Sequence, residues 1–185
     1  MATSRKSNSP KKSKSPSVKT LKSIVSDSIR ASSITSDVIP IELLFSVIET
    51  KLVNQIKSKS QHIIILEVKQ LLRYANKLNK GNYKKEFDKL DFMSTVPAKL
   101  TPGQFLFYAA RGNNPDIARL LLENRKISNN DIKSAFEESI KKRSGKVAQL
   151  LIQSGKLSQV DRIVYSAELK QTEEGLRFYN SFIRV

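Results

Sequence analysis

The strongest constraint on the fold of this chain of 185 residues is an internal repeat in its C-terminal half. The segment IARLLLENRKISNND, from Ile117, aligns without a gap to VAQLLIQSGKLSQVD, from Val147. Apolar positions match apolar positions, and Ser128 matches Ser158. The two segments are 30 residues apart. Self-similarity at a fixed period of this length is typical of stacked helix pairs, because each pair leaves an apolar face that only its neighbour can cover.

The repeat units resemble ankyrin repeats on specific residues. In the stretch YAARGNNPDIARLLLENRKI, Ala109-Ala110 match the small, close-packing end of the family's first helix, and residues 120–122 match its outer helix. In the next unit Ser134 takes the place of the family's threonine, and Gly155 matches the glycine that closes the outer helix. The resemblance covers roughly residues 101–185, and it implies an all-α fold of ankyrin-like stacked helix pairs.

The chain also departs from the family pattern. Thr101-Pro102 lies three residues before the family's position for that dipeptide, and Arg125 replaces the closing glycine. The period is about 30 residues instead of about 33, and the shortfall lies between Arg125 and Ser134. We therefore expect the family's projecting finger to be reduced to a turn. A third unit, from Ile163, follows the pattern loosely, and its expected outer helix contains Leu176, Tyr179 and Phe182.

Two repeat units rarely fold alone, so we expect the preceding helices to cap them. Apolar residues at helical spacing predict helices over Ile41–Lys57, Ser60–Asn79 and Tyr83–Met93. The second is expected to bury Ile64, Leu66, Leu71, Leu72, Ala75 and Leu78, although the β-branched run 63–65 is also compatible with a strand. The predicted organisation is a tail, 1–36, a helical N-terminal block, 37–96, and an ankyrin-like repeat region, 97–185.

Positive charge is spread along the chain. The 33 Lys and Arg exceed the 17 Asp and Glu by 16, and residues 1–36, 51–99 and 100–185 contribute +7, +7 and +5, against −3 from residues 37–50. The tail is rich in Ser and Lys and lacks aromatic residues, so we expect it to be disordered. It is either a solubilising arm or a non-specific nucleic-acid tether acting through an SPKK-like turn with Lys11, Lys12 and Lys14. Phosphorylation at the two Ser-Pro pairs would act on Ser9 and Ser15.

The remaining cations form two groups of candidate binding residues. One helix face in the N-terminal block is either a patch for phosphate or an acidic protein, or a solvated face; it comprises Lys69, Arg73 and Lys77, extended by Lys84 and Lys85. The turns between paired helices are either partner-facing or ordinary solvated turns; they contain Arg111, Asn113 and Asn114, and then Lys141, Lys142 and Arg143.

The sequence offers little for catalysis. It has no Cys and one His, which excludes a disulfide framework and a thiolate zinc site, and it has no P-loop, GxSxG or GxGxxG motif. We therefore expect no enzymatic activity, no cofactor, no metal and no small-molecule substrate. No apolar run approaches the 18 or so residues of a membrane span, so we expect no membrane contact and an intracellular location, in the cytoplasm or nucleus.

Three functions remain for such a chain. The first is a non-enzymatic adaptor, because the ankyrin resemblance implies an unidentified protein partner, with a basic tail that contacts nucleic acid non-specifically. The second is a DNA- or RNA-binding or genome-packaging protein in which the repeats are scaffold. The third is a structural assembly protein that binds an acidic protein surface. Divergent repeats of this Lys-, Asn- and Ile-rich style are similar to those of large DNA viruses, which adds the virion as a location.

Overall fold

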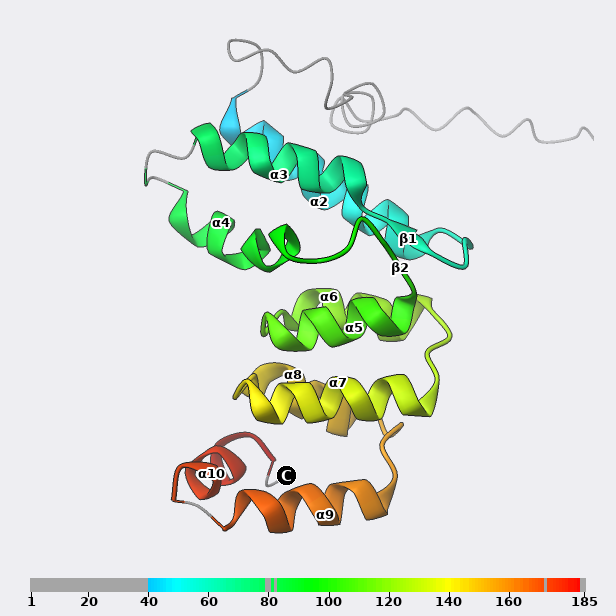
Figure 1. Ribbon diagram of the computed structural model, residues 1–185, viewed down its shortest axis with the longest axis vertical. Helices are drawn as coiled ribbons and strands as arrows, with labels where there is room; N and C mark the ends of the chain where they lie inside the picture. Colours follow the sequence, from blue (N-terminus) through cyan, green and yellow to red (C-terminus); the bar gives the residue numbers. More distant parts are fainter. Residues whose placement is uncertain (1–39, 79–80, 82, 172, 184–185) are drawn as a thin grey trace, which may run out of the picture.

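A computed structural model of the chain describes residues 40–78, 81, 83–171 and 173–183 (Figure 1). These residues are predominantly helical, which agrees with the predicted all-α class apart from one short strand pair. The helices lie in layers stacked along the long axis of the molecule, with the N-terminal block at one end and the C-terminal helices at the other (Figure 1). The tail that we expect to be disordered lies outside the described residues.

The N-terminal block consists of three helices and the first strand. Its helices are α2 (Ile41–Lys57), α3 (Leu66–Leu78) and α4 (Lys84–Asp91), which continues as the 3₁₀ turn η2 (Phe92–Ser94). α2 packs against α3 and buries one apolar face, comprising Leu44, Phe45, Val47, Ile48, Leu52 and Ile56. This spacing is that of an amphipathic helix with its apolar stripe in the core.

The predicted helix over Ser60–Asn79 is wrong in its first turns. The strand β1 (Ile63–Ile64) pairs antiparallel with β2 (Lys99–Leu100), and Ile63 lies opposite Leu100. Burial alternates along this run: Ile63 and Ile65 are buried, whereas Ile64 and Leu66 are 52% and 51% exposed. The alternation is that of a strand, and it moves two residues that were expected in the core to the surface. β2 follows the predicted boundary after residue 96, so its pairing with β1 links the N-terminal block to the start of the repeat region.

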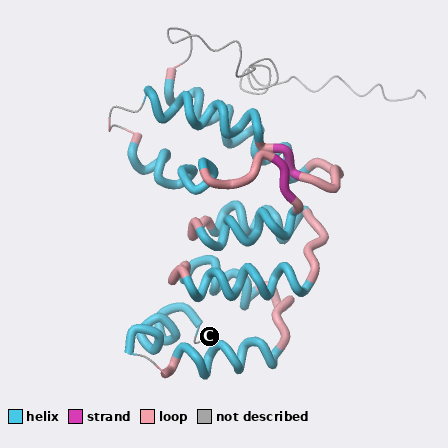
Figure 2. The backbone as a smooth tube through the Cα atoms, in the orientation of Figure 1, coloured by secondary structure: helices cyan, strands magenta, loops and turns pink. Residues whose placement is uncertain are grey.

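The repeat region consists of three successive helix pairs. The pairs are α5 (Pro102–Arg111) with α6 (Pro115–Asn124), α7 (Asn129–Lys141) with α8 (Gly145–Gln153), and α9 (Gln159–Leu169) with α10 (Glu173–Phe178) and the π-helical turn η3 (Tyr179–Ile183). Short turns within the pairs lie at one edge of the stack, and the connections between pairs lie at the opposite edge (Figure 2). The connection from α6 to α7 is short, comprising 125–128, where the finger was expected to be reduced.

Local capping residues explain where the first helix of each pair begins. The Oγ atoms of Ser128 and Ser158, at matching positions of the repeat, accept hydrogen bonds from the backbone N–H groups of Asp131 and Asp161 at 3.2 and 3.1 Å. Thr101 forms the equivalent cap of α5, and the side chain of Gln104 accepts a hydrogen bond from the Thr101 N–H in return. Such caps satisfy N–H groups that have no partner within the helix.

The third unit differs from its expected form. It begins at Gln159, and its second half is the short α10 followed by η3. Phe178 and Ile183 are the buried apolar residues of this half, whereas Leu176, which was expected in the outer helix, is 40% exposed. A single set of buried apolar residues runs from α2 through to η3, so the N-terminal block and the helix pairs share one core.

Candidate interaction surface

The turns within the first two helix pairs have the same backbone geometry. Asn113 and Arg143, at matching positions of the repeat, adopt left-handed conformations with φ of 47° and 55°. The N–H of Asn114 donates to Ala109 O at 2.9 Å, and the N–H of Ser144 donates to Ser139 O at 2.7 Å, again at equivalent positions. Asn tolerates the left-handed region well, whereas Arg does not favour it, so Arg143 takes this conformation because the turn requires it.

Asn114, which the sequence suggested as a partner-facing residue, is part of the interior. It is 3% exposed. Its Oδ1 accepts a hydrogen bond from the Ile117 N–H at 3.1 Å, and its Nδ2 donates to Lys89 O at 3.1 Å. The Asn114 amide therefore caps α6 and joins it to α4. Because it is buried and both of its polar atoms are engaged, Asn114 is not a candidate for contact with a partner.

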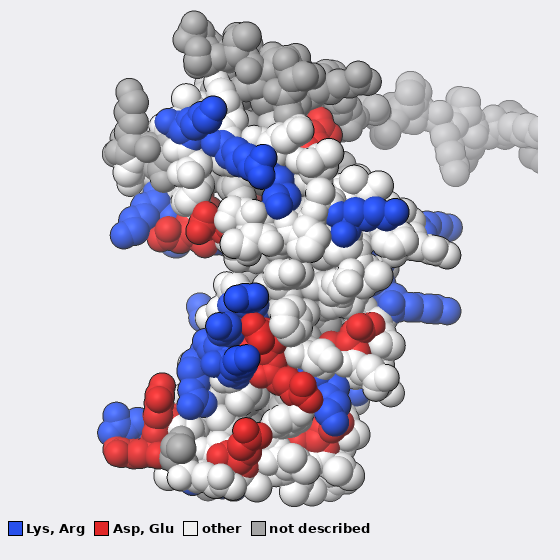
Figure 3. Space-filling view, viewed as in Figure 1, with Lys and Arg blue, Asp and Glu red and all other residues white. Residues whose placement is uncertain are grey.

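The other residues of the two turns lie at the surface and form what we call the cationic edge, defined as Arg111, Lys141, Lys142 and Arg143. Lys and Arg side chains gather at this edge of the stack, where α5 and α7 end (Figure 3). Asn113 is exposed in the first of these turns. The structure thus brings together the cations of two turns that belong to successive repeat units.

The two arginines of the cationic edge are partly engaged with acidic residues. Arg111 Nε lies 3.7 Å from Glu138 Oε1, and Arg143 Nε lies 3.7 Å from Glu174 Oε1. The ammonium groups of Lys141 and Lys142 have no hydrogen-bond or ion-pair partner in the described part of the chain, and both residues are exposed. These two lysines are the cations of the edge that remain available to an acidic ligand.

The predicted patch on α3 is smaller than expected. Lys69 is half-buried, and its Nζ donates a hydrogen bond to Val96 O, so it holds the loop before β2 against α3. Arg73 and Lys77 are exposed on α3, and Lys84 and Lys85 are exposed at the start of α4. A band of positive side chains crosses α3 (Figure 3). The candidates in the tail lie outside the described residues: Lys11, Lys12, Lys14, Ser9 and Ser15.

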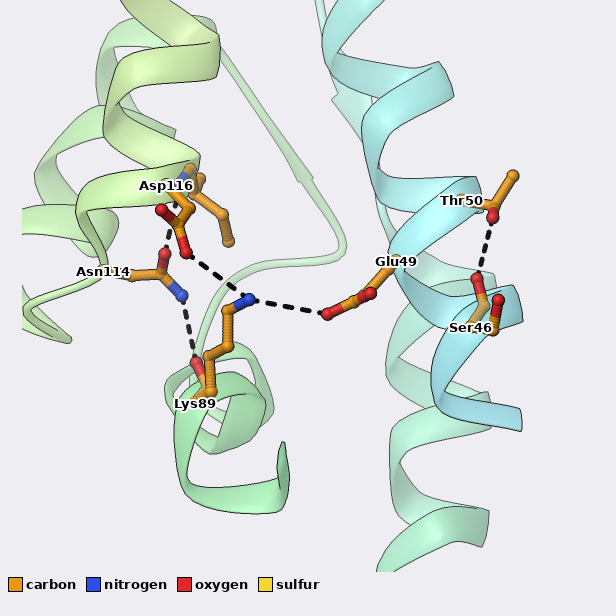
Figure 4. Close-up of polar contacts among 7 residues, drawn as sticks. Ser46, Glu49, Thr50, Lys89, Asn114 and Asp116 are labelled. Atoms are coloured by element: carbon orange, nitrogen blue, oxygen red, sulfur yellow. Dashed lines mark hydrogen bonds and ion pairs between the residues drawn. The ribbon is translucent and has the colours of Figure 1, made fainter. Parts of the chain in front are cut away.

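A polar junction joins the N-terminal block to the first helix pair. Lys89 Nζ lies 3.5 Å from Glu49 Oε1 of α2 and 3.4 Å from Asp116 Oδ2 of α6 (Figure 4). An apolar groove runs beside it between α2, α4 and α6; its apolar lining is Leu52, Val53, Ile56, Leu90, Ile117 and Leu120. The three charged groups are about half exposed, so solvent weakens their attraction, and their main effect is to orient α4 between its neighbours.

A second hollow lies between α7 and α9, next to the cationic edge. It is lined by residues of mixed charge, including Glu137, Lys141, Arg143 and Glu168. The Tyr165 hydroxyl donates a hydrogen bond to Glu137 across it, and burial together with this hydrogen bond raises the pKa of Tyr165. Tyr165 is therefore a neutral hydrogen-bond donor here, and its ring packs edge-to-face on Phe136 at 5.5 Å between centroids.

Sequence reasoning missed two charged residues that hold the surface in place. Lys89 was one cation among many, and its two carboxylate partners lie on other helices that are distant in sequence. Arg125 was noticed only as a departure from a glycine. Its guanidinium binds the end of α2, which no short-range pattern could indicate because the partners lie in the other half of the chain.

The described residues contain no group of three or more His, Cys, Asp or Glu side chains placed to hold a metal ion. None of the described helices has the length and apolar content that a membrane span requires. Comparison of the chain with known family models, with curated proteins and with solved structures finds no match.

Proposed function

We propose that the chain is a non-enzymatic protein-interaction module built from ankyrin-like helix pairs, and that its cationic edge binds an acidic surface on a protein partner. The observation that carries this proposal is the pair Lys141 and Lys142. Both are exposed on a turn with fixed backbone geometry, and neither has an acidic partner among the described residues. The backbone of this turn needs no ordering when a partner binds, so the conformational entropy cost is confined to the lysine side chains.

The proposal includes the basic tail as a second, weaker contact. Its lysines would bind nucleic acid non-specifically, through phosphate contacts that weaken as salt rises. The alternative is a nucleic-acid-binding protein in which α3 and α4 supply the interface. The observation that favours this alternative is that four of the five predicted cations there are exposed and have no acidic partner in the described residues: Arg73, Lys77, Lys84 and Lys85.

Charge-reversal variants of the full chain separate these functions. The probes are poly-glutamate, for an acidic protein, and an unrelated DNA duplex. K141E/K142E tests the cationic edge, and R73E/K77E tests the α3 patch. K99E/K126E is the matched control, since Lys99 and Lys126 are also exposed but precede α5 and α7 at the opposite edge. Each variant changes the net charge by the same amount, so a difference between them reports position.

We expect K141E/K142E to weaken poly-glutamate binding at least about fivefold relative to the control, because each exposed ion pair contributes about 0.5 kcal/mol and reversal adds repulsion. Equal losses in all three variants would contradict a localised site and leave only the net charge. A loss confined to DNA binding by R73E/K77E would favour the alternative. A form starting at Ser36 measures the tail, and its removal should reduce the slope of log affinity for DNA against log salt.

A further inference from the structure

The last helix pair exposes an apolar stripe along α9. Val160, Ile163 and Val164 are 69%, 62% and 54% exposed, and Ala167 is exposed beside them. Their spacing of i, i+3, i+4 and i+7 places the four side chains on one face of the helix. The stripe lies at the end of the described stack, where no further helix covers it (Figure 1). We call these four residues the α9 stripe.

Two residues of the α9 stripe lie at positions that match, in the repeat, the residues by which α7 contacts α9. Lys133 of α7 binds Asp161 at 3.0 Å, and Glu137 accepts the hydrogen bond from Tyr165. Ile163 and Ala167 are the residues that match these two in the next repeat unit. The face of α9 that corresponds to the stacking face of α7 is therefore apolar instead of charged.

The outer face of α9 is apolar and is not covered by any of the described residues. Contiguous exposed apolar surface marks a site of interaction. A shallow groove between α9 and η3 extends the stripe along one side; Ile163, Ala167 and Tyr179 line it together with the polar Gln159, Arg162, Ser166 and Lys170. A helix laid on this face would bury both the stripe and the groove.

We propose that the α9 stripe binds the α9 stripe of a second copy of the chain, with the two helices antiparallel about a two-fold axis. The stripe is symmetric about its own centre, between Ile163 and Val164. A reversed copy therefore places Val160 opposite Ala167 and Ile163 opposite Val164, which is the self-complementarity that a two-fold interface requires.

The distribution of charge supports this occupant. Overall the chain carries +16, so most of its surface repels a second copy. Residues 159–183 carry four acidic and three basic side chains and are nearly neutral. In the antiparallel arrangement Gln159 lies opposite Glu168, Asp161 opposite Ser166 and Arg162 opposite Tyr165, so no like charges lie directly opposite each other along α9. The end of the stack is thus the part of the described structure where two copies approach with least repulsion.

Sedimentation of the full chain over micromolar concentrations tests the proposal. We expect a reversible shift from 20.9 kDa toward twice that mass. I163E should raise the dissociation constant of the dimer at least about 30-fold, because symmetry removes the contact twice. I64E is the matched control, since Ile64 is also an isoleucine about half exposed, in β1 at the other end of the molecule, and it should leave the dissociation constant unchanged.

Cysteine cross-linking locates the contact. The natural chain has no Cys, so V164C provides a single thiol beside the proposed axis, and it should form a disulfide-linked dimer under mild oxidation, whereas K126C should not. A wild-type chain that stays monomeric throughout overturns the proposal and leaves the face to a helix of another protein. The predicted tail also contains apolar residues, Val25 and Ile29 among them. A dimer that is lost in V25E/I29E but kept in I163E also overturns the proposal, in favour of a contact through the tail. Neither result bears on the cationic edge, which is tested separately.

Discussion

At the residue scale, Arg125 connects the first helix pair to the N-terminal block. Its Nε donates to Ile56 O at 2.7 Å, and its Nη2 donates to Gln55 O at 3.0 Å and to Ser58 Oγ at 3.2 Å. These acceptors lie at the end of α2, where the last carbonyls of a helix have no partner and where the helix dipole favours a cation. The planar guanidinium reaches several acceptors at once, which lysine does not do.

R125A should lower the free energy of unfolding by about 2 to 3 kcal/mol, because it removes hydrogen bonds between a charged group and half-buried carbonyls. R125K should recover only part of this loss. R119A is the control: Arg119 is exposed on α6 and has no partner among the described residues, so its removal should change stability by less than about 0.5 kcal/mol. Urea unfolding followed by circular dichroism measures all three, and equal stability of R125A and R119A would show that the cap does not contribute.

At the scale of elements, the spacing between helices depends on residues with little or no side chain. Ala109 and Ala110 are fully buried on α5 where it packs against α7. Gly145 opens α8 in direct contact with Phe182 of η3, and a Cβ built on Gly145 would lie 2.4 Å from the ring carbon Cγ. The close approach of η3 to α8 is therefore possible only with glycine at this position.

G145A should lower the free energy of unfolding by about 1 to 3 kcal/mol through overpacking, although alanine is the better helix former. In an F182A background the ring is absent, and the same substitution should be neutral or stabilising by up to about 1 kcal/mol. Thermal unfolding of the wild type, G145A, F182A and the double variant gives the coupling free energy between residues 145 and 182. An equal effect of G145A in both backgrounds would mean that the ring does not restrict residue 145.

At the scale of the whole molecule, the buried apolar residues form one core that extends from Leu44 in α2 to Ile183 in η3. The polar contacts of Lys89, Asn114 and Arg125 cross the boundary between the N-terminal block and the helix pairs. Stacked repeats are stabilised by their interfaces with neighbours. We therefore expect the block and the helix pairs to unfold together.

I48A, in the fully buried part of α2, should cost about 2 to 5 kcal/mol by leaving a cavity. If the molecule is one cooperative unit, I48A should lower the free energy of hydrogen exchange of the most protected amides by the same amount in α7 as in α3. Protection in α7 that does not change in I48A would instead show that the helix pairs are independently stable.

Much of the local structure followed from short-range patterns. Apolar spacing predicted α2 closely, and the structure adds that the two Ser-x-x-Asp segments of the repeat cap α7 and α9. The helical pattern that follows the run 63–65 favoured a helix there over a strand, whereas Leu100, the strand partner of Ile63, lies beyond α3 and α4 in sequence. Strand formation depends on such a partner more than on the residues themselves, so periodicity in one segment does not decide it.

The sequence by itself determined the largely helical class and the period of the repeat, because the periodicity of apolar residues is visible within short stretches of the chain. Only the tertiary structure decided which cations remain available to bind an acidic partner. Lys69, Lys89 and Arg125 are held by carbonyls or carboxylates distant in sequence, Asn114 is buried, and Lys141 and Lys142 stay exposed. A charged side chain shows its role only through the groups around it, and folding is what brings those groups together.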